Sequence, residues 1–494
     1  MSIVSGRLPN TLFLSLVTID PNSSVPLYRQ IYSGLRDGIL DGRLAAGTRL
    51  PSTRDLAKIW QVSRTTLRNA FDQLIAEGYL EAIVGHGTFV AQIEAQLVPE
   101  PSRQIEPLVE RVRPISVIGQ ILEPLGRSIK QPVLPASAFA VGVPDYHAFP
   151  HQTWSRIVNR VQRRASAGKR LGQPVNGVRQ LREAIASYLV SARGLRCKAE
   201  QVDIVPGSVT GMLIAALAFV NRGDKFWMED PGYLSASATL RYRGAELIPV
   251  PVDDEGIDVE SGMTMAPDAR VAYVTPSHQY PLGVTLSLRR RQLLLDWAAR
   301  QNAWIFEDDY DSAIRYDGPP LTALQGLDKN QRVIYFGTFS KILFPDLRLG
   351  YVVLPPDLVD VYTGVKLPLS MSSPPIIQNV VAEFMLEGHF VRHIRRMRQH
   401  YKARRDALAE AVERHLGGVL TLGSLDCGIH TVGYLAEGFH EAEVIQKGRE
   451  LGMALAPLAE LYAGKGRPGF MIGFTNVQPE QIDGFMSRLA QAIL

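Results

Sequence analysis

A proline-rich stretch divides this chain into two parts of different character. From residue 91 to residue 135 there are seven prolines, and five basic residues are balanced by five acidic ones. Proline fixes φ and removes a backbone donor, so the stretch favours an extended linker with one short helix near 117–122. Because 494 residues are too many for one ordinary core, we expect a small domain over 20–92, a linker over 93–135 and a large domain over 136–494.

Composition and charge exclude several classes of protein. With 46% hydrophobic and 21% charged residues the chain is neither disordered nor fibrous, and a net charge of +4 permits an anionic partner without requiring one. The two cysteines, Cys197 and Cys427, lack neighbouring ligands at metal spacing, so we expect no disulfide framework and no metal site. The longest apolar run, 212–220, is too short for a membrane span, and no export signal is recognisable. We therefore expect a cytoplasmic protein with no membrane partner.

Residues 26–90 have the pattern of three helices followed by a strand pair. The first helix has apolar residues at helical spacing, namely Leu27, Ile31, Leu35 and Ile39. Ser52 and Ser63 are placed to cap two further short helices, which meet across Gln61 and Val62 as in a helix-turn-helix. Two strand-like runs then flank a turn whose glycines tolerate positive φ, made of Gly85, His86 and Gly87. This pattern predicts a winged helix-turn-helix.

The second helix of the pair carries groups suited to DNA. A recognition helix presents its first residues to the major groove, and here those residues are Ser63, Arg64, Thr65, Thr66 and Arg68. From Gln61 to Ala70 there are two arginines and no acid, and Arg54 at the start of the preceding helix is placed to reach a phosphate. An isolated basic helix is more often a solvated surface. The helix pair and the glycine-rich wing together favour DNA binding.

Beyond the linker, strand-like runs alternate with amphipathic helical stretches. The runs are 201–205, 225–229, 271–275, 304–307 and 333–336. This alternation predicts an α/β domain with a mainly parallel sheet covered by helices. A smaller α+β lobe is expected after a helix near 391–408. Because that helix carries seven basic residues and no acid over 391–405, we interpret it as a solvated face, with ligand binding as the alternative.

The large domain offers the groups that pyridoxal 5′-phosphate (PLP) chemistry requires. That chemistry needs a lysine to form an imine, an anion at the pyridine nitrogen, phosphate donors and an aromatic plate over the ring. Lys341 follows a strand and the hydroxyls of Thr338 and Ser340, with Arg348 seven residues further on. Asp308 ends an apolar strand, at the edge where α/β sheets bind ligands, and Tyr310 follows it.

A phosphate site is also predicted where a helix begins directly after a strand. Gly207, Ser208 and Val209 occupy that turn, and the free N–H groups of a helix N-terminus attract phosphate. Taken singly, these features have simpler interpretations: a surface lysine, a capping aspartate and an ordinary turn. Their order along one α/β domain is what favours a cofactor site.

Both halves of the chain resemble known families. The strings LPSTRDLA at 50–57, VSRTT at 62–66, EGY at 77–79 and GHGTFV at 85–90 resemble the GntR family of winged-helix regulators. The order of the PLP candidates resembles the fold-type I aminotransferases, with further similar strings at 142–145, 177–189, 229–233, 275–281, 307–312 and 392–408. The combination is similar to the MocR-type regulators, and the resemblance spans about 26–90 and 138–490. It implies a large domain with a seven-stranded sheet.

The resemblance also implies roles for individual residues. In the winged helix it implies DNA contacts by Arg54, Arg64, Thr65, Thr66 and Arg68, with the wing at 85–87 near the minor groove. In the large domain it implies Lys341 as the imine lysine, Asp308 on the pyridine nitrogen, Tyr310 on the phenolic oxygen and Tyr233 stacked on the ring. It places the phosphate among Gly207, Ser208, Thr338 and Arg348, and brings His278 and Gln279 near the ring face.

Two departures from the family pattern bear on the ligand. Many relatives have a tyrosine before the equivalent of Gly177 that reaches the neighbouring subunit's phosphate, and 171–176 contains none. Relatives often hold an amino-acid carboxylate with an arginine just before the Gly-Phe of the last strand. Here the chain reads RPGFMIGF over 467–474, and Arg467, the candidate effector residue, is close to that position but out of register. Either the effector lacks an α-carboxylate held in this way or another cation holds it.

The resemblance implies a regulator that senses an amine or amino-acid-like effector through PLP on Lys341. One winged helix covers only about 600–1,000 Å² on DNA, so we expect a homodimer, swapped head-to-tail, reading an operator of two half-sites. Two alternatives remain open: a working aminotransferase with a DNA-binding appendage, and a regulator that senses PLP itself to control vitamin B6 supply.

Overall fold

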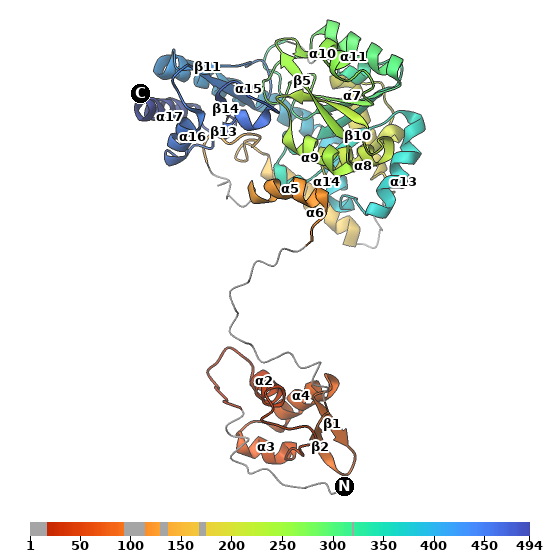
Figure 1. Ribbon diagram of the computed structural model, residues 1–494, viewed down its shortest axis with the longest axis vertical. Helices are drawn as coiled ribbons and strands as arrows, with labels where there is room; N and C mark the ends of the chain where they lie inside the picture. The colour runs from red at the N-terminus through yellow and green to blue at the C-terminus, as the bar shows by residue number, and fades with distance from the viewer. Residues whose placement is uncertain (1–16, 93–113, 129–136, 167–173, 319–320) are drawn as a thin grey trace. The chain divides into compact units, whose positions relative to one another are not determined.

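The chain divides into two compact units between Pro114 and Ile115 (Figure 1). The computed structural model describes residues 17–92, 114–128, 137–166, 174–318 and 321–494. Most of the expected linker and of the N-terminal stretch considered as an export signal lies outside the described residues. Within the described ranges no helix combines the length and apolar character needed to cross a bilayer. Both cysteines are free.

The first unit is the predicted winged helix. Its elements are α2 (Leu27–Leu40), α3 (Thr53–Ile59), α4 (Arg64–Ala76), β1 (Leu80–Ile83) and β2 (Gly87–Val90). The predicted caps are confirmed, because the hydroxyl of Ser52 accepts from the Asp55 N–H and that of Ser63 from the Thr66 N–H. Between the two helices Gln61 adopts a left-handed φ of 54°, which turns the chain sharply. The strands pair antiparallel from Leu80↔Val90 to Ile83↔Gly87, forming the wing.

The second unit is built on an eight-stranded sheet. Its order is β3-β10-β9-β8-β7-β4-β5-β6, with β3 (Val202–Val205), β4 (Lys225–Asp230), β5 (Glu246–Asp253), β6 (Gly256–Ile257), β7 (Val271–Val274), β8 (Trp304–Asp309), β9 (Val333–Thr338) and β10 (Gly350–Val353). Strands β5, β4, β7, β8 and β9 run parallel, as predicted, whereas β10 pairs antiparallel with both neighbours. The expected count of seven strands misses β6, which folds back on the end of β5 through a tight turn.

Helices cover both faces of this sheet. They are α6 (His151–Ser166), α7 (Arg179–Arg193), α8 (Ser208–Phe219), α9 (Leu234–Arg243), α10 (Val259–Met265), α11 (Leu288–Gln301), α12 (Leu324–Leu327), α13 (Val359–Leu369) and α14 (Pro375–Leu386). Residues of α8, α9 and α13 pack with Tyr273, Phe306 and Phe336 on one face. Residues of α6, α7 and α14, and of α10 to α12, form the clusters on the other face. Because β4, β7 and β8 are parallel neighbours, their carboxyl ends lie at the same edge of the sheet.

A smaller lobe follows the long helix α15 (His389–Leu416). It contains β11 (Leu420–Leu422), β12 (His430–Leu435), α16 (Glu441–Glu450), β13 (Ala456–Pro457), β14 (Gly469–Gly473) and α17 (Pro479–Ile493), in an antiparallel sheet of order β11-β12-β14-β13. Phe470 and Ile472 pack against α15 and α17. Since side chains alternate along a strand, Met471 points to the opposite face, where it pairs with Val432.

Two elements differ from the sequence predictions. Helix α5 (Val117–Ser128) is longer than the short helix expected in the linker, and it lies against α9. The basic residues of α15 are divided: Arg392, Arg395 and Arg396 are exposed, as the solvated-face interpretation expects, whereas Arg404 pairs with Asp145 and Lys402 and Arg405 pair with Asp317. Acidic partners from distant segments neutralise these three cations, so the interpretation was wrong for them.

Candidate functional site

The predicted DNA contacts lie on the surface of the winged helix. Arg54, Arg64, Thr65 and Arg68 are exposed, as are the wing residues Gly85, His86 and Gly87. Ser63 is exposed but its hydroxyl serves as the helix cap and lies 2.8 Å from the hydroxyl of Thr66, which is half-buried. The arginines therefore remain available for phosphates and base edges, whereas Ser63 and Thr66 fix the start of α4.

A further cation beside the wing was missed from the sequence. Arg49 forms an isolated β-bridge with Phe89, and a Cβ added at Gly87 would lie 3.2 Å from its guanidinium. The side chain is exposed and forms no ion pair with any of the described residues. Arg49 precedes the helix pair in an irregular segment, so no helical pattern drew attention to it.

Lys341 lies at the sheet edge just after β9. Its Nζ donates to the carbonyl of Gly142 at 3.2 Å. A Cβ at Gly142 would come within 2.4 Å of that nitrogen, so glycine is what leaves room for the lysine. Burial lowers the pKa of Lys341, while Asp311 and Asp308 oppose that shift. A buried lysine with a lowered pKa has a larger neutral, nucleophilic fraction.

Asp308 is the last but one residue of β8 and has one unsatisfied oxygen. The hydroxyl of Tyr273 donates to Oδ2 at 2.9 Å, whereas Oδ1 is buried and has no hydrogen-bond partner among the described groups. Burial raises the pKa of Asp308 to about 7. Buried polar atoms are normally paired, so the free oxygen fits a cationic N–H donor such as a protonated pyridine nitrogen.

The start of α8 provides the predicted anion site. Gly207 has a φ of 108° and precedes a first turn without a side-chain cap, which leaves the N–H groups of Ser208, Val209 and Thr210 without backbone acceptors in the described part of the chain. A Cβ at Gly350 would lie 3.0 Å from the Ser208 nitrogen, and Gly350 pairs with Thr338. These groups therefore converge as a phosphate site requires.

Two further predicted residues lie close to this turn. Burial raises the pKa of Tyr233, and the charge of Asp308 adds to this rise, whereas a hydrogen bond with Ser235 and the charge of Arg348 oppose it. Arg348 is exposed in a left-handed conformation, with φ 46°. The backbone N–H of Ser340 donates to the Thr338 hydroxyl at 3.2 Å, which orders the segment leading to Lys341.

Five rings, which we call the ring cluster, gather at the same edge: Tyr233, His278, Tyr280, Tyr310 and His430. Tyr280 lies 5.3 Å from Tyr233, 5.9 Å from Tyr310 and 5.6 Å from His430, measured between ring centroids. Tyr280 and His430 were not predicted as site residues. Tyr280 stands inside a family-like string that could have pointed to it, but nothing in the sequence indicates that His430 comes from the small lobe to this edge.

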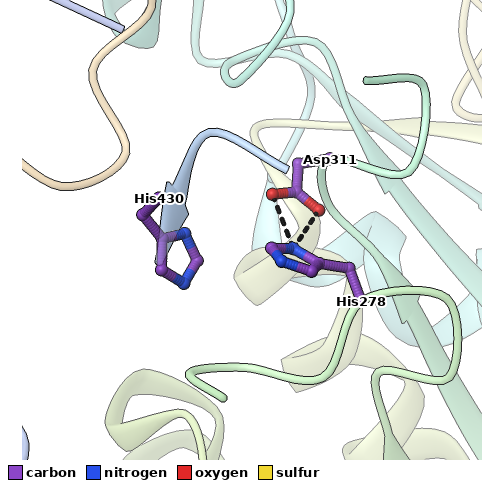
Figure 2. Close-up of side chains that lie close together, drawn as sticks. All are labelled: His278, Asp311 and His430. Carbon is purple, nitrogen blue, oxygen red and sulfur yellow. Dashed lines mark hydrogen bonds and ion pairs between the residues drawn. The ribbon is translucent and has the colours of Figure 1, made fainter. Parts of the chain in front are cut away.

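His278 joins Asp311 to Tyr310 within this cluster, and Figure 2 shows its contact with Asp311. Its Nδ1 lies 3.0 Å from both carboxylate oxygens of Asp311 and 2.9 Å from the hydroxyl of Tyr310. An ionised carboxylate only accepts hydrogen bonds, so Nδ1 carries a proton and donates it to Asp311. The hydroxyl of Tyr310 then cannot donate to Nδ1, and its proton is free for another acceptor, such as the cofactor's phenolic oxygen.

The three side chains in Figure 2 also offer metal-ligand atoms within 4.8 Å of one another. The sequence predicted no metal site. Here Nδ1 of His278 is already engaged by Asp311, and Nε2 of His430 lies 3.3 Å from the carbonyl of Pro281. Hydrogen bonding accounts for both contacts without an ion.

Two predicted residues occupy unexpected surroundings. The amide of Gln279 is used by the backbone, donating to the carbonyls of Pro231 and Tyr280 and accepting from the N–H of Leu282, so it supports the loop. Arg467 stacks over the ring of Tyr434, 3.9 Å from its centroid, and is exposed. Tyr434 pairs with Gly469, whereas His430 pairs with Gly473, so Arg467 lies beyond the end of β14 that is remote from the ring cluster.

Comparisons with known proteins agree with both units. Residues 27–90 match the gntR family of bacterial regulatory proteins, and 138–443 match the class I and II aminotransferases. The chain is 36% identical to the probable rhizopine catabolism regulatory protein MocR of Rhizobium meliloti over 97% of this chain and 96% of that protein. It is 28% identical to the pyridoxine biosynthesis transcriptional regulator PdxR of Corynebacterium glutamicum over 97% and 98%.

The crystal structure of a kynurenine aminotransferase from Pyrococcus horikoshii, in complex with PMP, superposes on 77% of this chain and 95% of its own. The TM-score is 0.67, with 27% identity. The free Asp308 oxygen, the half-buried Lys341 and the uncapped start of α8 fit pyridoxal 5′-phosphate, as that fold implies. The chain therefore belongs to the MocR-type subfamily of GntR regulators, in which a DNA-binding winged helix precedes a PLP-binding, aminotransferase-like domain.

Proposed function

We propose that this regulator binds its operator as a homodimer and senses an amine effector at Lys341. The observation that carries the proposal is the presence, in one site, of a half-buried lysine whose Nζ donates to the Gly142 carbonyl and of the unsatisfied oxygen of Asp308. Such a site receives a cationic ring and leaves the lysine able to react. The same chain carries an exposed recognition helix, which favours a regulatory role for this site rather than a metabolic one.

The residues of the site have separate tasks. Pyridoxal 5′-phosphate, when bound, supplies an electrophilic aldehyde and an electron-accepting ring. Asp308 keeps a proton on the ring nitrogen, and Tyr310 donates its hydroxyl proton to the phenolic oxygen because Asp311 already takes the Nδ1 proton of His278. The first turn of α8, Thr338 and Arg348 hold the phosphate. An incoming amine competes with Lys341 for the aldehyde.

A route from the site to the linker is supported by packing around α9. Tyr233 directly precedes α9, and the adjoining loop contacts the small lobe: the Gly232 N–H donates to the Leu461 carbonyl and the Ala463 N–H to Asp230. Helix α5, which begins just after the unit boundary, lies on α9 and lines a cavity of about 480 Å³ with these segments. An effector that prefers one placement of α5 by about 1.4 kcal/mol changes operator affinity tenfold.

The test is to load the purified chain with PLP and measure operator affinity with and without amines, on DNA that the protein itself selects from a random pool. We expect PLP uptake in a ratio of one per chain and a change in operator affinity when an amine is added. A protein that takes up no PLP, or whose operator affinity ignores every amine, would refute the proposal.

A working aminotransferase is the second candidate, favoured by the presence of Lys341, Asp308 and Tyr310 together. Sustained turnover with a 2-oxo acid acceptor would support it, whereas a single half-reaction supports the sensor. The similarity to PdxR favours a third candidate, in which PLP is itself the signal. In that case the PLP-free and PLP-bound forms differ in operator affinity before any amine is added.

A further inference from the structure

One face of the small-lobe sheet forms a wall next to Lys341. The residues on this face are His430, Val432 and Tyr434 of β12 and Met471 of β14, with Val432 and Met471 directly paired. His430 belongs to the ring cluster, and Val141, which directly precedes the Gly142 whose carbonyl accepts from Lys341, packs against Val432 and Met471, so this face adjoins the lysine. Val432 and Met471 pack with Leu282, which makes the middle of the wall apolar.

The wall carries no positive charge close to the lysine among the described residues. Burial, together with His278 and Lys341, lowers the pKa of His430 to about 3, so its imidazole is neutral at pH 7. Among the described residues of this face of β12 and β14 there is no lysine, and the arginine that stacks on it, Arg467, lies on Tyr434 at its far end. The carboxylates of Asp311 and Asp308 oppose the lowering of the Lys341 pKa by burial.

Arg467 is too remote to supply the missing charge. It stacks on Tyr434, which lies four residues from His430 along β12, or about 13 Å at the rise of a β-strand. A carboxylate on the carbon that bears an amine lies only about 2.5 Å from the nitrogen. Such a group would lie at the His430 end of the wall, where the imidazole is neutral, and it would be repelled by Asp311.

We infer that the effector is an amine without a carboxylate on its nitrogen-bearing carbon, whose uncharged body contacts the ring cluster and the apolar wall of Leu282, Val432 and Met471. Hydroxyl groups on that body find partners in His430 and the tyrosines. This inference rests on the proposed function, and it chooses between the two alternatives that the position of Arg467 left open.

The test compares amines with their carboxylated counterparts on the full-length, PLP-loaded protein: 2-aminoethanol with serine, 2-methylpropylamine with valine, and tyramine with tyrosine. Binding constants come from titrations of the cofactor's visible absorbance and from the change in operator affinity. We expect the amine of each pair to bind at least tenfold more tightly. Equal or tighter binding of the amino acids, with PLP bound, overturns the inference and leaves the proposed function standing.

A substitution adds a second test. Met471→Arg places a cation opposite Val432 on the wall, and we expect it to favour the amino acids, while Met471→Leu keeps the original preference. PLP uptake and thermal melting establish that each variant is folded; if Met471→Arg does not fold, the pairs measured on the unaltered protein decide alone. If no amine or amino acid acts on either readout, the proposed function fails and the inference with it.

Discussion

The two units hold their functional groups in opposite environments. In the winged helix Arg54, Arg64 and Arg68 are exposed on short helices whose caps are local, whereas in the large domain Asp308 is buried and Lys341 half-buried, both with shifted pKa values. Exposed cations read a polyanion by long-range attraction. Buried groups gain reactivity because water no longer stabilises their charged forms. Substitutions in the winged helix should therefore affect operator binding, whereas substitutions in the large domain should affect PLP binding and the response to amines.

The largest effect is expected for Lys341→Ala. Without the amine the cofactor has no covalent attachment, so its lysine-linked visible band should disappear and the response to amines with it. Operator binding itself should change by less than about threefold, because the recognition helix belongs to the other unit. Absorbance and operator titrations check this, with the exposed Lys465→Ala as the matched control. A parallel loss of DNA binding would show that the two units are not separable in this way.

Removing the charge of Asp308 should weaken PLP binding strongly. The pKa of this carboxyl is about 7 in the folded chain, against an ordinary value of 3.8, so the PLP-free protein favours the protonated form. Protonated Asp308 therefore makes its full contribution to the free energy of unfolding below about pH 4. This contribution, which is about 4 kcal/mol at most, is lost as the pH rises through 7.

Thermal melting of the PLP-free protein and of Asp308→Asn across pH 5 to 8 measures this loss. The wild-type chain should lose more stability than the variant as pH rises, and PLP should remove the difference because the ring nitrogen neutralises the carboxylate. Identical pH profiles for the two proteins would contradict the assignment of Asp308.

In the winged helix, Arg64→Ala should weaken operator binding by about tenfold to a hundredfold, as expected for a base contact of about 1–3 kcal/mol. Arg49→Ala should weaken binding to all sequences alike and reduce the salt dependence by about one unit, as for a phosphate contact. Arg43→Ala is the control, since Arg43 is paired with Asp41. Neither DNA variant should alter PLP uptake, and an altered uptake would contradict the separation of the two units.

The smallest effect is expected for Asp311→Asn. An amide no longer fixes the proton on Nδ1 of His278, so Tyr310 can donate to that nitrogen instead of the cofactor. The pH at which the bound cofactor changes colour should shift, with PLP affinity falling only a few-fold. An unchanged titration midpoint would mean that the pair has a purely structural role; the exposed His440→Gln serves as a control for general effects of substitution.

Local features were predictable from the sequence where neighbours in the chain decide them. The caps at Ser52 and Ser63 and the wing glycines follow from short-range chemistry, and Asp308 follows from its place at a strand end. Tyr280 stands in a family-like string of the large domain that could have pointed to it, whereas His430 was missed because its position depends on how the small lobe packs on the large one. The contacts of α15 were missed for the same reason, since Asp145 and Asp317 come from distant segments.

Coupling between the amine site and the operator is decided by titrating operator DNA with the PLP-loaded chain and with Lys341→Ala, each with and without a saturating amine. We expect the amine to change operator affinity at least tenfold in the unaltered protein and not at all in the variant. The same change in both proteins, or no change in either, would show that Lys341 does not carry the signal.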